Sequence, residues 1–502
     1  IIAGRMTLEG PVGDGSWMVS GRRTYLEPLL NAIRSESTEI PAYYFYDLNA
    51  KMNQNITDYD KLVISGYFGR DDMNLDLDEG SFVNVRWGNT AVTGKWTHIF
   101  SPTLFGNFLV AGSEYVSRTS LSFFDTPILL RNSIRDITVK GDLDFFASSD
   151  HSITAGFLAT RYDFNFRQSF NQRDLLNLKL NPYLLSLYGQ DQWQALGNTT
   201  IRLGIRGNYF SEQSRFDIEP RLSVSHLVTP TVRIKTGGGL YHQYLQLITT
   251  EGFSGGDFWV PLDSTVTPGF SWQTVAGFEW DPSERYQLSA EGYFTRLNNL
   301  VVLDNNQSAD GESSHSNDVF KTGGSGYATG LELFLKRRTG ALTGWIGYTL
   351  GWTRRTFTEL NRGQAFSPKY DRRHDLSLVA KYKTGNWTFG TNFVYATGQA
   401  FTPASARYSL RSPATGVLPD DDFVLPAGRN SARLLPYHRL DLSITKDFSL
   451  LGQNFQWYLQ VFNVYSRRNE WFIQYDTQNI NTKPEVVKQL PVIPTLGVNF
   501  KF

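Results

Sequence analysis

Apolar and polar residues alternate along most of this chain with a period of two. In 440–445, Leu, Leu and Ile alternate with Asp, Ser and Thr, and 201–206 and 496–502 follow a similar pattern. Successive side chains of a β-strand point to opposite faces, so the alternation predicts strands with one apolar and one polar face. No convincing amphipathic helix longer than about ten residues interrupts the pattern. We therefore predict an all-β protein.

Short segments rich in Gly, Pro, Asn, Asp and Ser separate the alternating stretches. These residue types favour turns, so each segment predicts a tight connection between two strands. Longer polar connections lie between them, the largest at 246–267, 298–317 and 399–435. We therefore predict a series of hairpins with short turns at one end and long connections at the other. The predicted turns are 11–15, 55–60, 101–103, 148–150, 196–198, 229–231, 281–283, 338–340, 383–386 and 449–454.

Three features favour a membrane-spanning barrel over a large soluble β protein, which remains the alternative. The stretch 131–147 runs on without a break, whereas strands of soluble proteins average about five or six residues. The polar face repeatedly carries charged residues, as the wall of a wide, wet lumen does. Aromatic residues near strand ends suit a girdle at the membrane interface. These aromatics are Trp87, Trp96, Phe100, Phe105, Trp193, Trp280, Trp345, Trp352, Trp387 and Trp457.

The number of strands sets the size of such a barrel. The ten turns define twenty strands, and a last strand over about 488–502 makes twenty-one. Lipid excludes open sheet edges, and single-chain bacterial barrels normally have an even number of strands. We therefore expect one more strand upstream of Ile1. This gives a transmembrane, antiparallel up-and-down β-barrel of the 22-stranded type, a size that holds a plugged lumen. A miscount near 471–477 is the alternative.

The composition excludes several classes of function. The chain has no Cys, which rules out disulfides, thiolate chemistry and Cys-ligated zinc. The 48 basic and 48 acidic residues cancel, so no global field favours nucleic acid. The seven His show no zinc-binding spacing, and no nucleophile–base arrangement is visible. We therefore expect no enzymatic activity, no metal and no cofactor.

A set of motifs, in a fixed order along nearly the whole chain, carries a resemblance to one family. Each motif is weak alone, but the ordered set is fairly specific. The motifs are LEGP (8–11), SGRRTYL (20–26), YDLNAK (46–51), EPRLS (219–223), YHQY (241–244), YDRRHDL (370–376), YHRLDL (437–442), NVY (463–465) and PTLGVNFKF (494–502). By these motifs the chain resembles the TonB-dependent receptors, specifically the branch common in Bacteroidota and their relatives.

The resemblance implies a function that periodicity cannot show. Members of this family import scarce or bulky solutes, such as metal chelates, cobalamin and glycans, across the outer membrane of Gram-negative bacteria. A globular plug closes their barrel, and a TonB-type inner-membrane complex pulls on a segment at the N-terminal side of the plug. The resemblance implies that 1–502 is the barrel domain, with the plug and the first strand upstream of it. Membrane lipid and lipopolysaccharide are further expected partners, and a surface lipoprotein is an additional candidate.

Two other functions stay open at this point. A passive porin-like channel would also have an apolar outside and a wet lumen, although such barrels usually have about 16–18 strands. A barrel that serves as a docking platform in an outer-membrane assembly is the other alternative.

The long connection near 252–262 offers the best candidates for ligand contact. It contains aromatic and acidic side chains, and further aromatics and a histidine precede it. Such a mixture commonly lines ligand sites, so we expect these residues at the barrel mouth. Packing within the loop or a place in the aromatic girdle is the alternative interpretation. The candidates are Tyr241, His242, Tyr244, Asp257, Phe258 and Trp259.

Three other features have competing interpretations. Phe500 and Phe502 end a strand of alternating apolar residues, and they form either an insertion signal for outer-membrane assembly, as in similar proteins, or ordinary lipid-facing aromatics. The run 372–375 could be a substrate site, but a lumen-facing charge network at a strand start is favoured because buried charges must pair. The aspartates of 420–422 could bind calcium, although a solvated acidic loop is favoured.

Overall fold

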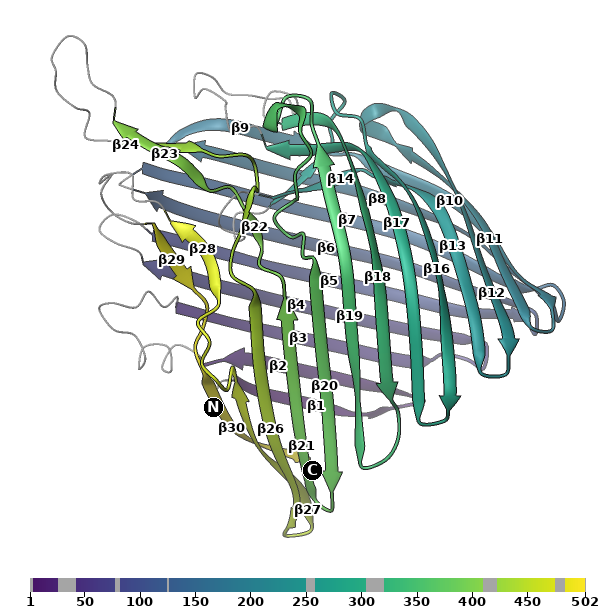
Figure 1. Ribbon diagram of the computed structural model, residues 1–502. Helices are drawn as coiled ribbons and strands as arrows, with labels where there is room; N and C mark the ends of the chain where they lie inside the picture. Colours follow the sequence, from purple (N-terminus) through teal and green to yellow (C-terminus); the bar gives the residue numbers. More distant parts are fainter. Residues whose placement is uncertain are drawn as a thin grey trace.

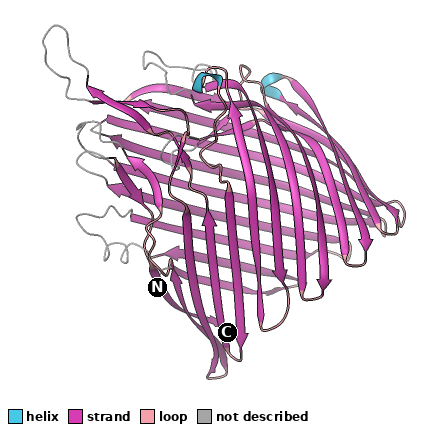
Figure 2. Ribbon diagram, in the orientation of Figure 1, coloured by secondary structure: helices cyan, strands magenta, loops and turns pink. Residues whose placement is uncertain are grey.

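A computed structural model of the chain describes residues 3–25, 42–76, 82–123, 126–249, 258–303, 320–409, 422–474 and 484–501. Nearly all of these residues lie in strands, which curl around into one large barrel (Figures 1 and 2). The described part also contains the 3-10 helices Ser211–Gln213 and Asn361–Gly363. No helix in these ranges is long and apolar enough to cross a membrane. The predicted all-β class is confirmed.

One antiparallel sheet of 22 strands forms the wall of the barrel, and with one exception each strand of the wall pairs with the next strand of the wall in chain order. This is the predicted up-and-down order. The first strands of the wall are β1 (Ala3–Val12), β2 (Gly15–Thr24), β3 (Ala42–Asn55), β4 (Asp60–Asp76), β5 (Phe82–Ser101), β6 (Leu104–Phe123), β7 (Thr126–Phe146), β8 (His151–Phe170), β9 (Arg173–Leu180) and β10 (Tyr183–Leu196). The others are β11 (Thr199–Phe210), β12 (Arg215–Thr229), β13 (Val232–Gln243), β16 (Gly269–Ser283), β17 (Tyr286–Leu303), β18 (Phe320–Arg337), β19 (Leu342–Thr356), β20 (His374–Thr384), β21 (Trp387–Ala396), β26 (Tyr437–Leu450), β27 (Gln453–Phe462) and β30 (Ile493–Lys501).

Two of these strands share one position around the wall. β9 pairs with the upper part of β8, and β10 pairs with its lower part, so the two lie end to end along the same neighbour. Pro182 lies between them and has no N–H to donate to the ladder, which fits the interruption. The 22 strands therefore fill 21 positions, the number that the turns predict. The segment near 471–477 adds none, because β28 (Glu470–Gln474) pairs with β29 (Glu485–Lys488) in a separate hairpin.

Nine of the ten predicted turns fall at a connection between two neighbouring strands of the wall, whereas 281–283 forms the end of β16 and the turn to β17 follows at 284–285. The first turn follows Val12, and the last follows Leu450. Gly13 and Gly452 have φ of 53° and 78°, a region that glycine adopts at little cost. The short turns lie at one rim of the barrel and the long connections at the other (Figure 1).

The two faces of the wall differ as the alternation predicts. Large apolar side chains are exposed on the outer face, with Leu203 at 61% and Leu442 at 42%. Polar side chains of the inner face hydrogen-bond across strands, as between Thr138 and Thr160 at 2.9 Å. The outer face therefore suits hydrocarbon and the inner face suits water.

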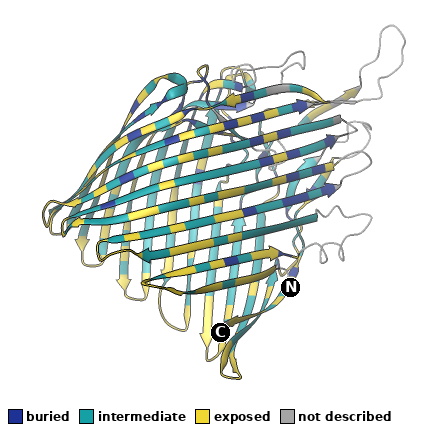
Figure 3. Ribbon diagram, turned by 180° about the vertical axis from the view of Figure 1, so that it is seen from behind, coloured by how far each residue is buried: buried dark blue, intermediate teal, exposed yellow. Residues whose placement is uncertain are grey.

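Buried residues gather toward the rim with the long connections (Figure 3). Hairpin β14 (Leu245–Ile248) and β15 (Phe258–Pro261) folds into the lumen there, where Ile248 packs with Phe166 of β8 and Leu130 of β7. A second cluster joins Val85 of β5 to Trp471 of β28. Both clusters show that elements of the long connections cover the inner face of the wall near this rim.

Trp87, which we expected in the aromatic girdle, packs instead against the second buried cluster, because its side of β5 faces inward.

The remaining described strands form two small hairpins, β22 (Ala400–Phe401) with β25 (Ala432–Arg433) and β23 (Ala404–Ser409) with β24 (Asp422–Pro426).

Candidate functional site in the barrel lumen

The end of β13 and the residue that follows it carry three of the candidates, Tyr241, His242 and Tyr244. The Tyr244 hydroxyl donates a hydrogen bond to Asp217 Oδ2 at 2.9 Å, and the His242 N–H donates to Glu219 Oε1 at 2.7 Å. The His242 ring lies between both carboxylates, with Nε2 3.3 Å from Asp217 Oδ1. All four side chains are buried. His242 and Tyr244 therefore attach the chain to the wall at the point where it turns into the lumen.

The inward hairpin carries two of the other three candidates, Phe258 and Trp259. Asn132 of β7 donates a hydrogen bond through Nδ2 to the Trp259 carbonyl at 2.5 Å, which fixes β15 against the wall. Of Phe258 the backbone in β15 is described, and Asp257 lies outside the described residues. The structure thus places Trp259 in the hairpin that folds into the lumen.

The segment after β15 is held by the 3-10 helix above β11. Gln213 Nε2 donates to the carbonyls of Asp263 at 2.9 Å and Val266 at 2.6 Å. Burial, followed by the charge of Asp263, raises the pKa of the neighbouring Glu212. These contacts hold the inward loop at both of its ends, so the loop narrows the mouth of the barrel.

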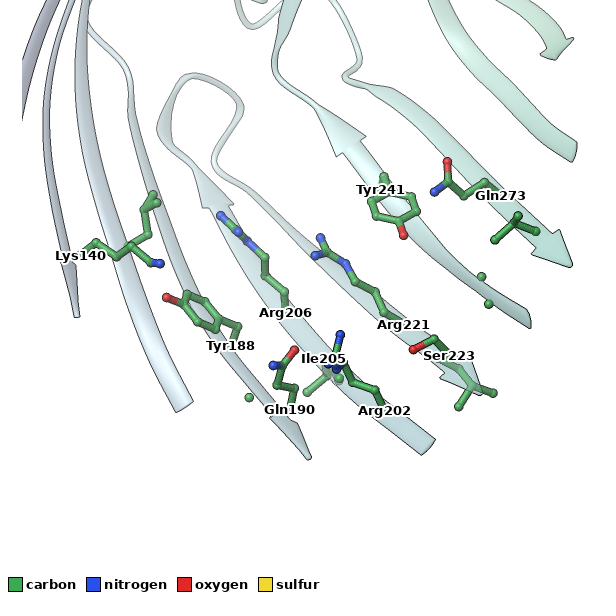
Figure 4. Close-up of a pocket in the computed structure, with 17 residues that line it drawn as sticks. Lys140, Tyr188, Gln190, Arg202, Ile205, Arg206, Arg221, Ser223, Tyr241 and Gln273 are labelled. Atoms are coloured by element: carbon green, nitrogen blue, oxygen red, sulfur yellow. The ribbon is translucent and has the colours of Figure 1, made fainter. Parts of the chain in front are cut away.

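A hollow of about 510 Å³ opens in the inner face of the wall below this loop, between β7 and β16 (Figure 4). Tyr241 lines it, the one candidate residue that does so among the described side chains. Gly204 contributes to its floor between Arg202 and Arg206, where an added Cβ would lie 3.2 Å from Gln190 Cβ. The missing side chain at Gly204 therefore leaves room inside the ring of longer side chains.

Four cations converge on the hollow from neighbouring strands, and no described carboxylate lines it. Lys140 Nζ pairs with Asp142 Oδ2 at 2.8 Å, and Arg221 pairs with Glu219 at 2.7 Å. Figure 4 shows Arg202, Arg206 and Arg221 reaching toward the same space. The side chains that line the hollow therefore carry a net positive charge, part of which is balanced by Asp142 and Glu219 beside it.

Two of these cations lack a compensating charge. Arg206 donates through Nε to Asn208 Oδ1 at 2.8 Å and through Nη2 to Ser186 Oγ at 2.9 Å. Arg202 donates to Gln192 Oε1 at 2.5 Å. These partners are neutral, and within the described residues neither arginine forms an ion pair. Both guanidinium groups retain the capacity to bind an anion.

Two tyrosines give the hollow aromatic surface. The ring of Tyr188 lies between Lys140 and Arg206, with its centroid 6.0 Å from Lys140 Nζ and 5.7 Å from Arg206 Cζ. The Tyr241 ring centroid lies 4.9 Å from Arg221 Cζ. Cation–π contact holds the long cationic side chains in place. The hollow can therefore bind a solute that carries anionic groups and flat surfaces.

The charged run 372–375 lies next to a buried network of hydrogen bonds. The acid at the centre of that network is Asp371, the residue just before the run. Arg433 donates to the Asp371 carboxylate and carbonyl, and the Thr353 N–H donates to Asp371 Oδ1 at 2.7 Å. Arg373 lies 4.4 Å from the Trp352 ring centroid. These contacts fasten the chain ahead of β20 to neighbouring elements, which is a structural role.

The other features noted in the sequence occupy separate places. Phe500 is 48% exposed on β30 and stacks on Phe455 at a centroid distance of 4.7 Å. Phe502 and the first two aspartates of 420–422 lie outside the described residues. In the part of the chain that the structure describes, no group of three His, Cys, Asp or Glu side chains is arranged to hold a metal ion.

Sequence reasoning missed the cations of the hollow. Arg202, Arg206 and Arg221 each lie on the polar face of a strand, and alternation alone assigns them to the lumen. The usable signal was the pairing of β11 with β12, which brings Gly204 opposite Arg221. That register places the cations around a position without a side chain.

Comparisons with known proteins agree with this architecture. A family model described as TonB dependent receptor-like, beta-barrel, matches residues 10–464. Among curated proteins no significant sequence match was found. Similar solved structures include the pyoverdine-bound FpvA of Pseudomonas aeruginosa, with a TM-score of 0.70 and 10% identity over 99% of this chain and 69% of that chain.

The ferric yersiniabactin uptake receptor FyuA from Yersinia pestis has a TM-score of 0.69 and 13% identity, covering 99% of this chain and 77% of that chain. The ferric-catecholate import receptor Fiu from E. coli has a TM-score of 0.67 and 12% identity, covering 100% and 80%. At these low sequence identities, the similarity to solved structures shows only that the folds are alike. The matching family model shows that the chain is related to the family. This chain belongs to the TonB-dependent receptors, in the region that forms their β-barrel.

Proposed function

We propose that this chain forms the wall of an energised outer-membrane transporter that takes up a metal chelate with anionic groups. The observation that carries the proposal is the lumen hollow, where Lys140, Arg202, Arg206 and Arg221 converge with no lining carboxylate among the described residues. Carboxylate and phosphate groups bind arginine through strong, charge-assisted hydrogen bonds. A neutral glycan would stack on the tyrosines but would leave Arg202 and Arg206 without counter-charge. The chemistry of the hollow therefore favours the chelate over the glycan.

We further propose that a plug and one more barrel strand precede β1 in the same protein, as in the branch common in Bacteroidota. β1 pairs with β2 and β30 pairs with β27, and in the described residues β1 and β30 are not paired with each other. Both strands run from the long-connection rim to the short-turn rim. One strand of the opposite direction between them would satisfy both edges in an antiparallel sheet.

Energy for uptake would come from a TonB-type inner-membrane complex that acts on the plug. Membership of the TonB-dependent receptors supports this step. A passive channel is the rival function, and it differs in one measurable respect, because diffusion through an open pore needs no energised inner membrane.

Uptake of radiolabelled ferric citrate by cells that carry the full-length protein tests the proposal. We expect uptake that stops when an uncoupler removes the proton-motive force and that falls at least tenfold in the double variant Arg202→Gln/Arg206→Gln. The control is Lys95→Gln, because Lys95 lies on the inward side of β5, away from the hollow. Uptake that continues in uncoupled cells would identify a passive channel. Equal uptake by the double variant and the wild type would remove the hollow from the transport path.

A further inference from the structure

A second hollow of about 300 Å³, the lower hollow, continues the first one toward the short-turn rim. Four residues line both hollows, namely Arg202, Ser223, Gly237 and Val275, and Figure 4 shows Arg202 and Ser223 in the first. Thr200, the second residue of β11, lines the lower hollow alone, and β11 begins directly after the short turn at 196–198. The two hollows therefore form one groove down the inner face of the wall.

A glycine leaves the floor of the lower hollow without a side chain. Lys235 of β13 lies opposite Gly277 of β16, and Gly277 lies opposite Glu291 of β17. An added Cβ at Gly277 would lie 2.6 Å from Glu291 Cγ, so the Glu291 side chain lies directly over this glycine. All three residues line the lower hollow. The close approach at Gly277 thus gives the Glu291 carboxylate its place in the lower hollow.

The two charged groups of this row differ in their counter-charge. Lys235 Nζ pairs with the Glu279 carboxylate, which also accepts a hydrogen bond from Gln287 Nε2 at 2.5 Å. The Glu291 carboxylate forms no ion pair or hydrogen bond with any residue that the structure describes. The lower hollow therefore contains an unbalanced negative charge, whereas no described carboxylate lines the first hollow.

The groove becomes less favourable for anions toward the short-turn rim. Four cations line the first hollow, whereas Arg202 and Lys235 line the lower hollow together with Glu291. Because Arg202 borders both hollows, an anionic group can move from one to the other without leaving its guanidinium. In the lower hollow the group meets the Glu291 carboxylate, which repels it. Passage through a series of sites requires binding that is weak enough for the solute to leave the last one.

We propose that the lower hollow is the release station of the solute path, where Glu291 repels the anionic group that Arg202 transfers from the first hollow. The lower hollow binds the same class of ligand as the first one, a carboxylate or phosphate group of the solute, and holds it less tightly. Glu291 sets the rate of release and leaves the strength of capture unchanged. This inference rests on the proposed function and adds the step by which the solute leaves the groove.

Uptake kinetics of radiolabelled ferric citrate, in energised cells that carry the full-length protein, test the inference. Glu291→Gln removes the repulsion, so the anion stays longer in the lower hollow. We expect the maximal rate and the half-saturating concentration both to fall by roughly fivefold or more, because slower release lowers both while capture is unchanged. Glu291→Thr is a second neutral variant that suits a strand, and it should behave in the same way.

Two controls separate charge from structure. Glu332 lies opposite Glu291 on β18 and lines neither hollow, so Glu332→Gln should leave both constants at wild-type values. Glu291→Asp should keep both constants within about twofold of the wild type, because it retains the negative charge. Heat-modified migration on gels establishes that each variant is folded.

Wild-type constants in the neutral variants of Glu291 would overturn the inference. A lower maximal rate with an unchanged half-saturating concentration would also overturn it, because that result indicates damage to the protein and not slower release. Equal effects of Glu291→Gln and Glu332→Gln would do the same. Failure of the proposed function has a different signature, since the wild type itself would then show no uptake or would continue uptake in uncoupled cells, and this inference would fall with it.

Discussion

His242 lies between Asp217 and Glu219 where β13 turns into the lumen, with Nε2 3.3 Å and Nδ1 3.4 Å from the nearest carboxylate oxygens. Asp217 also accepts a hydrogen bond from Tyr244 and pairs with Arg215 Nε at 2.6 Å. One carboxylate therefore joins the wall to the loop that narrows the mouth.

Asp217→Asn should loosen this loop. The substitution removes the charge that Arg215 and His242 face, and charged hydrogen bonds are worth about 1.5–3 kcal/mol each. We expect faster hydrogen exchange of the β14 amides, with a fall of about 1–3 kcal/mol in their opening free energy. The control is Asp281→Asn, because Asp281 pairs with Arg338 in a solvent-exposed position at the short-turn rim. Unchanged protection of β14 in Asp217→Asn would contradict this account of the loop.

Gly204→Val should narrow the hollow. The new side chain would occupy the space between Arg202 and Arg206, and valine suits a strand. We expect retention of ferric citrate to fall at least tenfold, as measured by equilibrium dialysis of the folded full-length protein. Gly94→Val is the matched control, since nothing lies within 4 Å of a Cβ at Gly94. Wild-type affinity in Gly204→Val would show that the solute binds elsewhere.

Leu442→Arg should destabilise the barrel by roughly 2–4 kcal/mol if Leu442 lies at mid-depth, because the change puts a charge against hydrocarbon. Leu442 is 42% exposed in the middle of β26, on its outer side. Thr445→Arg, on the inner side of the same strand, should change stability by less than about 1 kcal/mol. Denaturant unfolding in lipid vesicles gives both values. Similar losses for the two variants would contradict the assignment of faces.

Phe500→Ala and deletion of Phe502 test the insertion signal. If the terminal aromatics guide assembly, both changes should lower the amount of heat-modifiable barrel in the outer membrane several-fold. If Phe500 is an ordinary lipid-facing residue, only its stacking on Phe455 is lost, a contact worth about 0.5–1.5 kcal/mol beyond its buried area. Normal assembly with that small loss of stability would favour the second interpretation.

The features that depend on local sequence were predictable. A turn is specified by a few neighbouring residues, so Gly13 and Gly452 mark hairpins before any partner strand is known. Alternation likewise assigns Leu442 to the outer face without knowledge of its neighbours. Together these two local rules predict the order of the strands and the number of positions around the wall.

Features that depend on long-range register were not predictable. Ile248 packs against Phe166, and this contact between distant segments decides that the hairpin folds inward. Asp371 binds the side chain of Arg433, which lies 62 residues further along the chain. A partner so distant in sequence cannot be recognised from local motifs, so the motif pointed to the neighbouring run 372–375 instead. Trp87 looked like a girdle residue because it lies near a strand end, but the inward side of β5 carries it to a buried cluster. Alternation shows which residues of a strand share a face. It shows whether a residue points to the lumen only when the orientation of another residue of the same strand is already known.

The most direct test of the account is a scan of probe accessibility along β26 in membranes. The chain has no Cys, so single spin-labelled cysteines at 439–445 report one position each. We predict that labels at the even-numbered positions collide with oxygen dissolved in lipid and that labels at the odd-numbered positions collide with a water-soluble nickel complex. Uniform exposure to nickel on both sides of the strand would contradict a membrane-embedded barrel with a wet lumen.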